Sequence, residues 1–427
     1  MTEVHNRRAA ATRPFDRSGE ISAAPHPDLV LLPGDETPPL DVVASRAVSA
    51  GLRRIHVVAW RDLDDPEAGG SEMHAHRIAS QWAAAGLDVT MRTSAAAGRP
   101  WRDERHGYHV VRKSGRYAVF PRSALSGLVG RRGRPDGLVE IWNGMPFLSP
   151  LWARCPSVVF LHHVHAEMWR MVLPPALARI GELVERGLAP PLYRRSRILT
   201  LSESSRREIV SMLGFRPERV TAVPPGLDPR FTPGGTRSAA PLVVAVGRLV
   251  PVKRFDLLVD ALAQVKATVP DLRAVIVGEG YERPALEARR RATGAEDWIE
   301  LPGYVDEDGL LDAYRRAWVV ASTSQREGWG MTVTEAGACG TPSVATRIAG
   351  HVDAVLDGVS GLLVDRPDSG PAAVTAVAEA LRTVLTDGAL RARLGRGARA
   401  HARTLSWERT AARTLQALVD EAPNRAG

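Results

Sequence analysis

The stretch REGWGMTVTEAGACGTP, residues 326–342, decides how the second half of the chain folds. It follows the apolar run WVVASTS, which predicts a buried strand. Gly328 and Gly330 then allow a tight turn in which the backbone can approach a ligand closely. A helix is expected to begin near Met331 and to end at Gly340, because glycine commonly terminates helices. The stretch is therefore a strand–loop–helix unit.

This unit carries two carboxylates, Glu327 in the loop and Glu335 on the helix, with seven residues between them. The free N–H groups at the start of a helix favour an anion such as a phosphate. Carboxylates repel phosphate but accept hydrogen bonds from hydroxyl groups on both oxygens. We therefore expect Glu327 to hold sugar hydroxyls, Glu335 to hold the diol of a ribose, and the turn between them to hold phosphate.

Strand and helix patterns alternate along most of the chain, which indicates parallel βαβ units. The Pro- and Gly-rich segment VPPGLDPRFTPGGTRSAAP interrupts the alternation and is the best candidate for a linker. The predicted fold class is α/β, with two Rossmann-like parallel-sheet domains that face each other. The predicted divisions are a partly disordered extension (1–51), a first domain (52–223), a hinge linker (224–240), a second domain (241–405) and a last helix (about 406–421) that packs back on the first domain.

The composition excludes some classes of protein and leaves others open. Two cysteines, Cys155 and Cys339, cannot form a disulfide framework, so a reducing cytoplasm is the expected location. No apolar run is long enough for a transmembrane helix, and the first residues lack the apolar core of a secretory signal. The net charge of +8 admits anionic partners but selects none.

Two cations follow the strand pattern VVAVG in the second domain. Arg248 lies at the expected strand end and Lys253 near the start of the next helix. Guanidinium and ammonium groups beside a helix N-terminus suit a diphosphate, although the two residues taken alone could be solvated surface charges.

Four stretches together carry a family resemblance: VGRLVPVKRFDLLVDAL, VIVGEG, LPGYVDEDGLLDAYRRA and REGWGMTVTEAGACGTPSVAT. In this order and spacing, from about residue 53 to 420, the chain resembles the retaining glycosyltransferases of family 4, which have the GT-B fold and the same two-glutamate motif. The resemblance implies that Arg248 and Lys253 bind the donor diphosphate and that Glu327 and Glu335 bind the donor sugar and the ribose. It also implies donor contacts from Gly278, Tyr304, Gly328, Trp329, Gly330 and Met331.

The first domain contributes weaker signals. Gly69 and Gly70 resemble the family's glycine loop, and His162 matches a histidine that the family places near the donor sugar. His163 and Asn143, each at the end of a predicted strand, are candidates for contact with the acceptor. The run HHVH could also ligate zinc, and DLDD (62–65) contains an acidic pattern that binds metal in other transferases. We expect DLDD to be a solvated loop and predict no metal and no cofactor.

The sequence predicts a metal-independent transferase that moves a hexose from a UDP- or GDP-sugar to an unidentified hydroxyl, and the family resemblance implies that it retains the anomeric configuration. Its catalytic residues would be Glu327, His162, Arg248 and Lys253. A sugar-nucleotide epimerase and a non-catalytic nucleotide-sugar binder remain alternatives. A dehydrogenase is disfavoured because no G-x-G-x-x-G follows a strand, and no nucleic-acid module is recognisable. The arginines of 99–134 and 193–197 admit peripheral contact with an anionic membrane at its inner face, but a solvated face is favoured.

Overall fold

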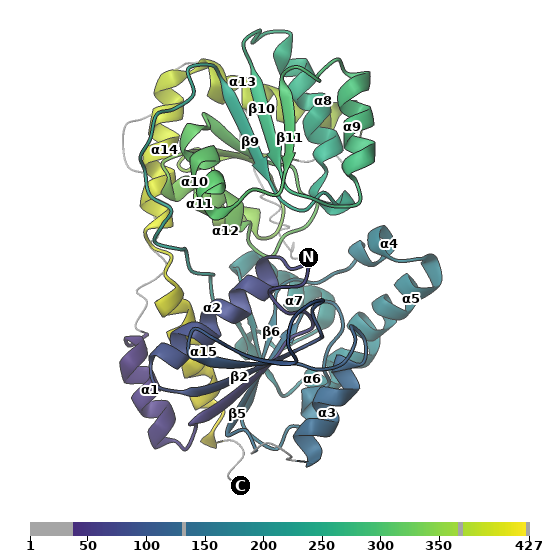
Figure 1. Ribbon diagram of the computed structural model, residues 1–427, viewed down its shortest axis with the longest axis vertical. Coiled ribbons are helices and arrows are strands. Elements are labelled where there is room, and N and C mark those ends of the chain that lie inside the picture. The colour runs from purple at the N-terminus through teal and green to yellow at the C-terminus, as the bar shows by residue number, and fades with distance from the viewer. Residues whose placement is uncertain (1–36, 130–133, 366–369, 424–427) are drawn as a thin grey trace, which may run out of the picture. The chain divides into compact units, whose positions relative to one another are not determined.

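The computed structural model describes residues 37–129, 134–365 and 370–423 and contains two β-sheets. Strands of residues 54–222 form an eight-stranded sheet, and strands of residues 242–364 form a six-stranded sheet (Figure 1). Helices flank both sheets, so the predicted α/β class with two parallel-sheet domains is confirmed. The part of the predicted extension that comprises residues 1–36 lies outside the described residues.

The N-terminal sheet has the strand order β3-β4-β2-β1-β5-β6-β7-β8, and only the β3–β4 pairing is antiparallel. Its strands are β1 (Arg54–Val58), β2 (Asp88–Thr93), β3 (Arg102–Arg105), β4 (Tyr108–Arg112), β5 (Gly137–Trp142), β6 (Ser157–Leu161), β7 (Arg197–Thr200) and β8 (Val220–Ala222). The helices of this part are α1 (Leu40–Ser49), α2 (Gly70–Ala84), α3 (Val119–Val129), η1 (Ser149–Leu151), α4 (Met168–Val172), α5 (Pro175–Leu183), η2 (Val184–Leu188), α6 (Ala189–Tyr193), α7 (Glu203–Leu213) and η3 (Pro217–Arg219).

The C-terminal sheet is entirely parallel and has the order β11-β10-β9-β12-β13-β14. Its strands are β9 (Leu242–Val246), β10 (Arg273–Val277), β11 (Ile299–Gly303), β12 (Val319–Ser322), β13 (Ser343–Thr346) and β14 (Gly361–Val364). The helices are η4 (Pro251–Lys253), α8 (Phe255–Lys266), α9 (Arg283–Ala292), α10 (Glu307–Arg316), α11 (Met331–Ala338), α12 (His351–Ala354), α13 (Pro371–Thr386), α14 (Gly388–Ala402) and α15 (Trp407–Asp420).

Periodicity explains why the helices of the C-terminal part pack as they do. In α8, Phe255, Leu258, Leu262 and Val265 recur every three or four residues and form one apolar face. All four are buried in the core between this helix and the sheet. The opening stretch also folds as expected, because α11 begins at Met331 and is followed by a glycine with positive φ at position 340.

Two segments differ from the sequence-based expectation. No regular element was predicted before residue 53, yet α1 forms and buries Val43 and Ala47. The arginine-rich segment 99–134, interpreted from the sequence only as a solvated face, contains the β3–β4 hairpin and α3. The helix α1 packs against α15, a partner distant in sequence that local periodicity does not report. The β3–β4 hairpin is a local pairing, and its strand β4 is joined to the sheet through β2.

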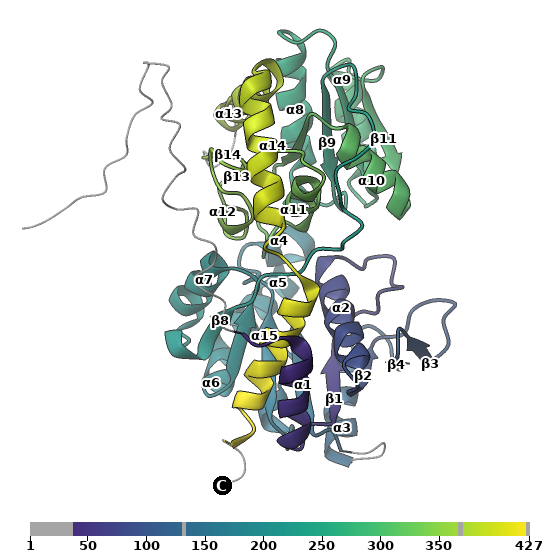
Figure 2. The same ribbon diagram turned by 90° about the vertical axis from the view of Figure 1, so that its left-hand side faces the viewer.

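The last helix, α15, lies beside α1 and α2, as both ribbon views show (Figures 1 and 2). Ser406 caps its start by accepting a hydrogen bond from the backbone of Arg409. The backbone at Gly226 in the linker contacts Trp407 so closely that an added Cβ would lie 2.2 Å from the Trp407 nitrogen. No helix of the described residues is both long and apolar enough to cross a membrane.

Candidate functional site

The order of the C-terminal sheet indicates where a ligand would bind. The chain passes from β9 outwards to β10 and β11, and then returns to β12 on the other side of β9. In open parallel sheets, ligands bind at the carboxyl ends of the strands on either side of such a switch point. Arg248 follows β9 and Glu327 follows β12, so two of the predicted residues lie at this position.

Lys253 and Glu327 are brought together at the switch point. The Lys253 ammonium donates to Oε1 of Glu327 over 2.5 Å, and the Ser324 hydroxyl donates to the same oxygen over 2.8 Å. Burial alone would favour the neutral acid, but the charge and hydrogen bond of Lys253 outweigh it and lower the pKa of Glu327. Glu327 is thus an ionised carboxylate that already has a cationic partner. We did not identify Ser324 from the sequence, although its position three residues before Glu327 could have indicated a hydrogen-bond partner.

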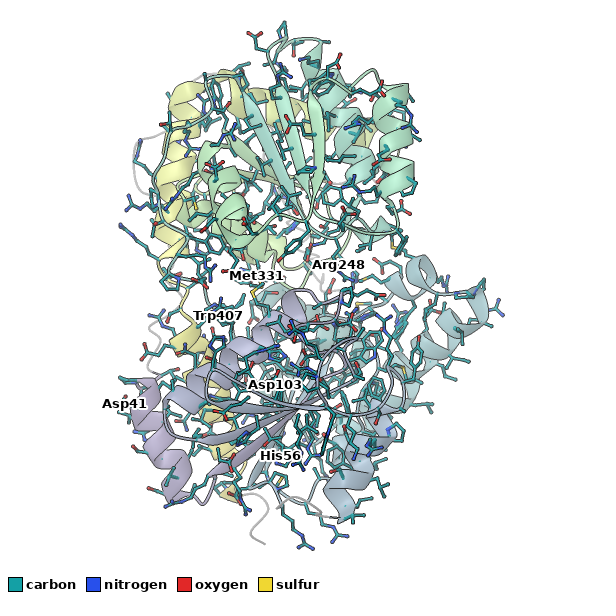
Figure 3. All side chains as sticks on the ribbon, in the orientation of Figure 1. Asp41, His56, Asp103, Arg248, Met331 and Trp407 are labelled. Atoms are coloured by element: carbon teal, nitrogen blue, oxygen red, sulfur yellow. The ribbon has the colours of Figure 1, made fainter. Side chains whose placement is uncertain are left out.

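Arg248, labelled in Figure 3, lies beyond the carboxyl end of the inner strand β9. It is beside the glycine loop of the N-terminal part. A Cβ placed on Gly69 would lie 3.6 Å from Nε of Arg248. The side chain is exposed, and among the described residues no carboxylate forms an ion pair with it. A cation that lacks a carboxylate partner and lies next to a glycine is suited to a phosphate group, which accepts hydrogen bonds from guanidinium and backbone alike.

The turn before α11 and the first residue of α11, Met331, lie against the N-terminal part. An added Cβ on Gly328 would lie 2.5 Å from the backbone oxygen of His162, and one on Gly70 would lie 3.4 Å from the sulfur of Met331. Gly330 has φ +106°, a conformation that side chains rarely adopt. The indole of Trp329 is buried and stacks towards His401, so only the backbone of this predicted donor residue is left for a ligand.

Gly278, a predicted donor contact, lies among glycines at the ends of three neighbouring strands. Gly247, Gly278 and Gly303 all have positive φ, and the Gly278 nitrogen donates to the Gly303 oxygen over 2.8 Å. A Cβ on Gly278 would lie 2.0 Å from the oxygen of Gly247, so only glycine fits there. Tyr304 follows at once and is 81% exposed, which leaves its ring free to lie against a planar ligand.

Glu335 occupies a different environment from Glu327. It is 6% exposed, on the inner side of α11, and Oε2 accepts a 2.8 Å hydrogen bond from the hydroxyl of Tyr314. Burial raises the pKa of Glu335 to about 7, only partly opposed by that hydrogen bond. The next charges that act on it belong to Arg77, Asp228 and Arg230.

The histidines of the N-terminal part differ from one another in their surroundings. The ring of His162 is 3% exposed, and its Nε2 lies 3.2 Å from Nδ1 of His74. Burial lowers the pKa of His162 to about 3, so the ring is neutral. His163 stacks on His165 at 4.7 Å, its buried Nε2 has no partner among the described residues, and Lys253 is among the charges that lower its pKa.

Asn143 lies at the switch point of the N-terminal sheet, where β1 and β5 are neighbours. Its side-chain amide donates to the Ser71 hydroxyl over 2.6 Å, and that hydroxyl in turn donates to Glu72 over 2.8 Å. Glu72 also accepts from the backbone of Gly69 over 2.9 Å. Asn143 is therefore held against the glycine loop by a continuous set of hydrogen bonds.

A cluster of arginines beside this loop was not identified from the sequence. Arg61, which is 5% exposed, pairs with Glu72 and, at 3.3 Å, with Glu67. Arg116 also holds Glu67, by two hydrogen bonds. The sequence offered one signal for this cluster, the position of Arg61 directly after the first predicted strand. Arg116 gave no signal, because it lies within a segment that was interpreted as solvated.

The acidic loop DLDD does not have the solvated structure that we expected. Asp62 is fully buried and pairs with Arg112, which is also buried. Asp64 pairs with Arg112 and with Arg105. The carboxylates are thus counterions of arginines from the β3–β4 hairpin. Within the described residues no group of three His, Cys, Asp or Glu side chains is arranged to hold a metal, and metal independence stays a prediction.

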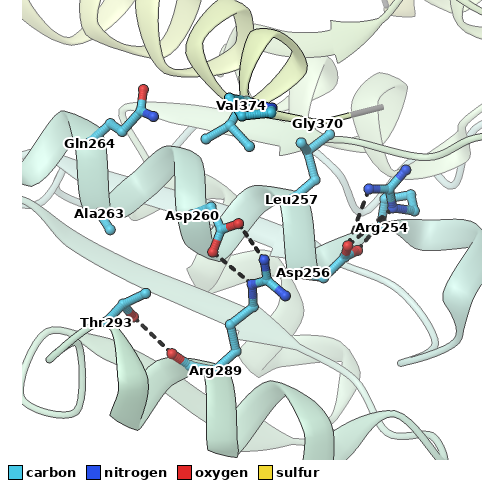
Figure 4. Close-up of a pocket in the computed structure, with 11 residues that line it drawn as sticks. Arg254, Asp256, Leu257, Asp260, Ala263, Gln264, Arg289, Thr293, Gly370 and Val374 are labelled. Carbon is cyan, nitrogen blue, oxygen red and sulfur yellow. Dashed lines mark hydrogen bonds and ion pairs between the residues drawn. The ribbon is translucent and has the colours of Figure 1, made fainter. Parts of the chain in front are cut away.

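A surface cavity of about 530 Å³ lies elsewhere, between α8, α9 and α13 (Figure 4). Its charged side chains pair with each other, Arg289 with Asp260 and Arg254 with Asp256. Because it is lined by none of the residues described above and has its charges neutralised internally, we do not assign the function to it.

Comparison with known proteins identifies the family of the chain. Residues 231–401 match the family model of glycosyl transferases group 1, and residues 68–231 match that of glycosyltransferase family 4. A D-inositol 3-phosphate glycosyltransferase from Kribbella flavida is 37% identical over 240 residues, 52% of this chain and 55% of that protein. One from Acidothermus cellulolyticus is 32% identical over 413 residues, 85% of this chain and 90% of that protein.

Solved structures share the fold at lower identity. A sucrose-phosphate synthase from Thermosynechococcus elongatus has a TM-score of 0.72 at 20% identity, over 85% of this chain and 98% of that one. Anabaena HepE, in complex with UDP-glucose, has a TM-score of 0.66 at 19% identity, over 87% and 99%. From the family models and the similarity to the Acidothermus protein over most of both chains, the chain belongs to the family 4 glycosyltransferases.

Proposed function

We propose that this protein transfers a hexose, with retention of anomeric configuration, from a nucleoside-diphosphate sugar to a hydroxyl group of a phosphorylated polyol. One observation carries the proposal: Arg248, Lys253 and Glu327 lie at the switch point of the C-terminal sheet, beside the Gly69–Gly70 loop. This arrangement supplies cations for a diphosphate and an ionised acceptor for sugar hydroxyls in one place.

Different groups of the donor would bind to different residues of this site. Arg248, Lys253 and the first N–H groups of α11 would stabilise the diphosphate as it leaves, an electrostatic contribution to catalysis. Glu327 would accept hydrogen bonds from the sugar, and Glu335 from the ribose. Glu327 is already paired with Lys253 and Ser324, which suits a binding residue better than a nucleophile.

The bond changes then follow without a covalent intermediate on the protein. The acceptor oxygen attacks the anomeric carbon on the face from which the diphosphate departs. The carbon–oxygen bond to the diphosphate breaks, and the proton of the acceptor hydroxyl passes to the departing phosphate oxygen. The protein contributes position and charge and requires no metal or cofactor in this scheme.

The arginine cluster supports an anionic acceptor. Glu67 is 55% exposed in its side chain, yet Arg61 and Arg116 both hold it. Hydrogen bonding from Arg116 lowers the pKa of Glu67, so its carboxylate is ionised. Two guanidinium groups that converge on one anion near the glycine loop could equally bind a phosphate, which would displace Glu67. The similarity to proteins named D-inositol 3-phosphate glycosyltransferase makes an inositol phosphate the first acceptor to test.

The test is an acceptor-dependent turnover assay. Wild-type protein is incubated with UDP- and GDP-sugars, with D-inositol 3-phosphate or with inositol, and the glycosylated product is measured by mass spectrometry. We expect product from one donor class with the phosphorylated acceptor only. Release of nucleotide without acceptor would favour an epimerase, and donor binding without turnover a non-catalytic binder. Glu327→Gln should abolish transfer, whereas Glu300→Gln, an exposed residue of β11, should not.

The acceptor site has its own test. Arg116→Gln should raise the KM for the phosphorylated acceptor and leave the KM for the donor unchanged. Glu67→Gln should lower the acceptor KM, because the internal competitor for the two arginines is weakened. Arg122→Gln, at an exposed arginine of α3, is the control. Equal effects of Arg116→Gln on both substrates would contradict this assignment.

A further inference from the structure

The helical run from α5 through the π-helical turn η2 to α6 exposes an apolar stripe. Its outward residues recur every three to five positions, and the exposed fractions are 52% for Leu177, 55% for Ile180, 59% for Leu183 and 57% for Leu188. Figure 1 shows α5 at the periphery of the N-terminal part. A helix on the surface of a globular protein normally turns such residues inwards, so a continuous outward stripe indicates a partner surface.

The opposite side of this run is firmly attached to the fold, so the stripe cannot turn inwards. Gly181 packs on the indole of Trp169, where an added Cβ would lie 2.6 Å from the ring. Glu185 is fully buried and accepts hydrogen bonds from the backbone of His165 and Ala166, at 2.7 and 3.0 Å, and from the indole of Trp169 at 3.1 Å. The run is therefore anchored to the loop that follows β6.

The charges around the stripe are almost all positive. Arg179, Arg186, Arg194 and Arg195 are exposed, and no described carboxylate forms an ion pair with any of them. The two acids of the run are otherwise engaged, Glu182 with Arg170 and Glu185 with the buried backbone. The stripe and these four arginines are named here the leucine–arginine face.

We propose that the leucine–arginine face docks on the surface of an anionic lipid bilayer. Leucine side chains enter the boundary between head groups and acyl chains, while arginines at the edge of the stripe pair with lipid phosphates. A second copy of the chain is a poorer occupant. A two-fold contact sets the same patch against itself, and here it would bring the arginines of one copy towards those of the other.

Docking would place the transfer site near the membrane surface. The loop pinned by Glu185 follows β6 and includes His162 and His163, so the docked helix and the candidate site share one rigid connection. A protein held in this way would work at the bilayer surface without crossing it. The inference does not depend on the identity of the donor or the acceptor.

The test is binding of the full chain to vesicles. Sedimentation with phosphatidylglycerol–phosphatidylcholine vesicles is compared with sedimentation with pure phosphatidylcholine, at low and high salt. We expect binding to the anionic vesicles only, weakened by salt. Arg179→Gln combined with Arg186→Gln should weaken partition into the anionic vesicles about 30-fold. The estimate assumes that each basic residue contributes about 1 kcal/mol to membrane binding. Arg393→Gln with Arg396→Gln, on the exposed side of α14, should have no effect.

A second variant tests the apolar part. Ile180→Ser with Leu183→Ser should lower partition by at least about tenfold, since each side chain would lose its burial in the bilayer. Thermal unfolding shows whether the serine variant is folded. If the serine variant is unfolded, the arginine variant still tests the proposal. No binding to anionic vesicles, or equal binding of both variants and wild type, would overturn the proposal. So would a dimer in light scattering that either variant dissociates. No nucleotide sugar is present, so failure here leaves the proposed transferase activity untouched.

Discussion

Replacing Glu335 by glutamine should make the ligand-free protein more stable at alkaline pH. Glu335 is 6% exposed and is bonded to the Tyr314 hydroxyl. Because burial raises its pKa from 4.5 to about 7, the folded state binds this proton more tightly than the unfolded state does. The stabilising contribution of the protonated acid is therefore complete below about pH 4.5 and is lost as the pH rises through about 7.

The size of the effect follows from the shift. One pKa unit corresponds to about 1.4 kcal/mol, so the ionised carboxylate costs up to about 3 kcal/mol of folding free energy above pH 7. Glutamine keeps the shape of the side chain and cannot ionise. Glu335→Gln should therefore match wild type at about pH 5 and exceed it by up to about 3 kcal/mol at about pH 9.

The assay is urea denaturation of wild type, Glu335→Gln and Glu300→Gln across this pH range. The exposed Glu300 serves as the control, and its substitution should follow wild type throughout. If wild type and Glu335→Gln lost stability in parallel as the pH rises, the carboxylate would not be the titrating group, and the argument from burial would be refuted.

The same ionisation should govern donor binding. A ribose diol donates hydrogen bonds and prefers the ionised carboxylate, so wild type should bind its nucleotide sugar more tightly above pH 7 than below it. Isothermal titration should show this dependence for wild type. It should show weaker binding with little pH dependence for Glu335→Gln. A variant with unchanged affinity would remove Glu335 from the donor site.

Two further substitutions test the hinge and the charge pair. Lys253→Met should lower kcat/KM at least about 100-fold, because a cation on the leaving diphosphate is lost. The same substitution should raise the pKa of Glu327. Steady-state kinetics over a range of pH measure both effects, and unchanged turnover would exclude this role of Lys253. Gly226→Ala should destabilise the fold by at least about 2 kcal/mol, since the new methyl group meets the Trp407 backbone. In the same denaturation assay Gly115→Ala, which has open space around it, should shift stability by less than about 0.5 kcal/mol.

Much of the C-terminal part could be predicted because its signals are local. Each of these elements is a single continuous segment whose own residues specify its structure, as in the apolar runs of β9 and β12 and the turn before α11. Arg248 and Glu327 could be placed at strand ends by the same logic. Their common switch point required only the general rule for parallel sheets.

The parts that could not be predicted depend on contacts distant in sequence. Asp62 looked like a solvated acid because its buried partner, Arg112, comes from the β3–β4 hairpin. The orientation of the Trp329 ring depends on packing near His401 of α14. The charge cluster at Glu67 needs Arg116, which lies 49 residues further along the chain. No periodicity or spacing within one segment encodes such pairings.

Because α15 packs on the N-terminal part, that part is synthesised first but can complete its fold only after the last helix has been made. The indole of Trp82 on α2 donates to the Ala411 oxygen over 3.0 Å, and Leu418 packs against Gly137 of β5. A growing chain emerges from the ribosome with the N-terminal sheet first, but the apolar surface of α1 and α2 that α15 covers stays exposed until the last helix has been made. Throughout translation of the C-terminal sheet, the first-made half therefore presents an apolar surface to which a chaperone can bind.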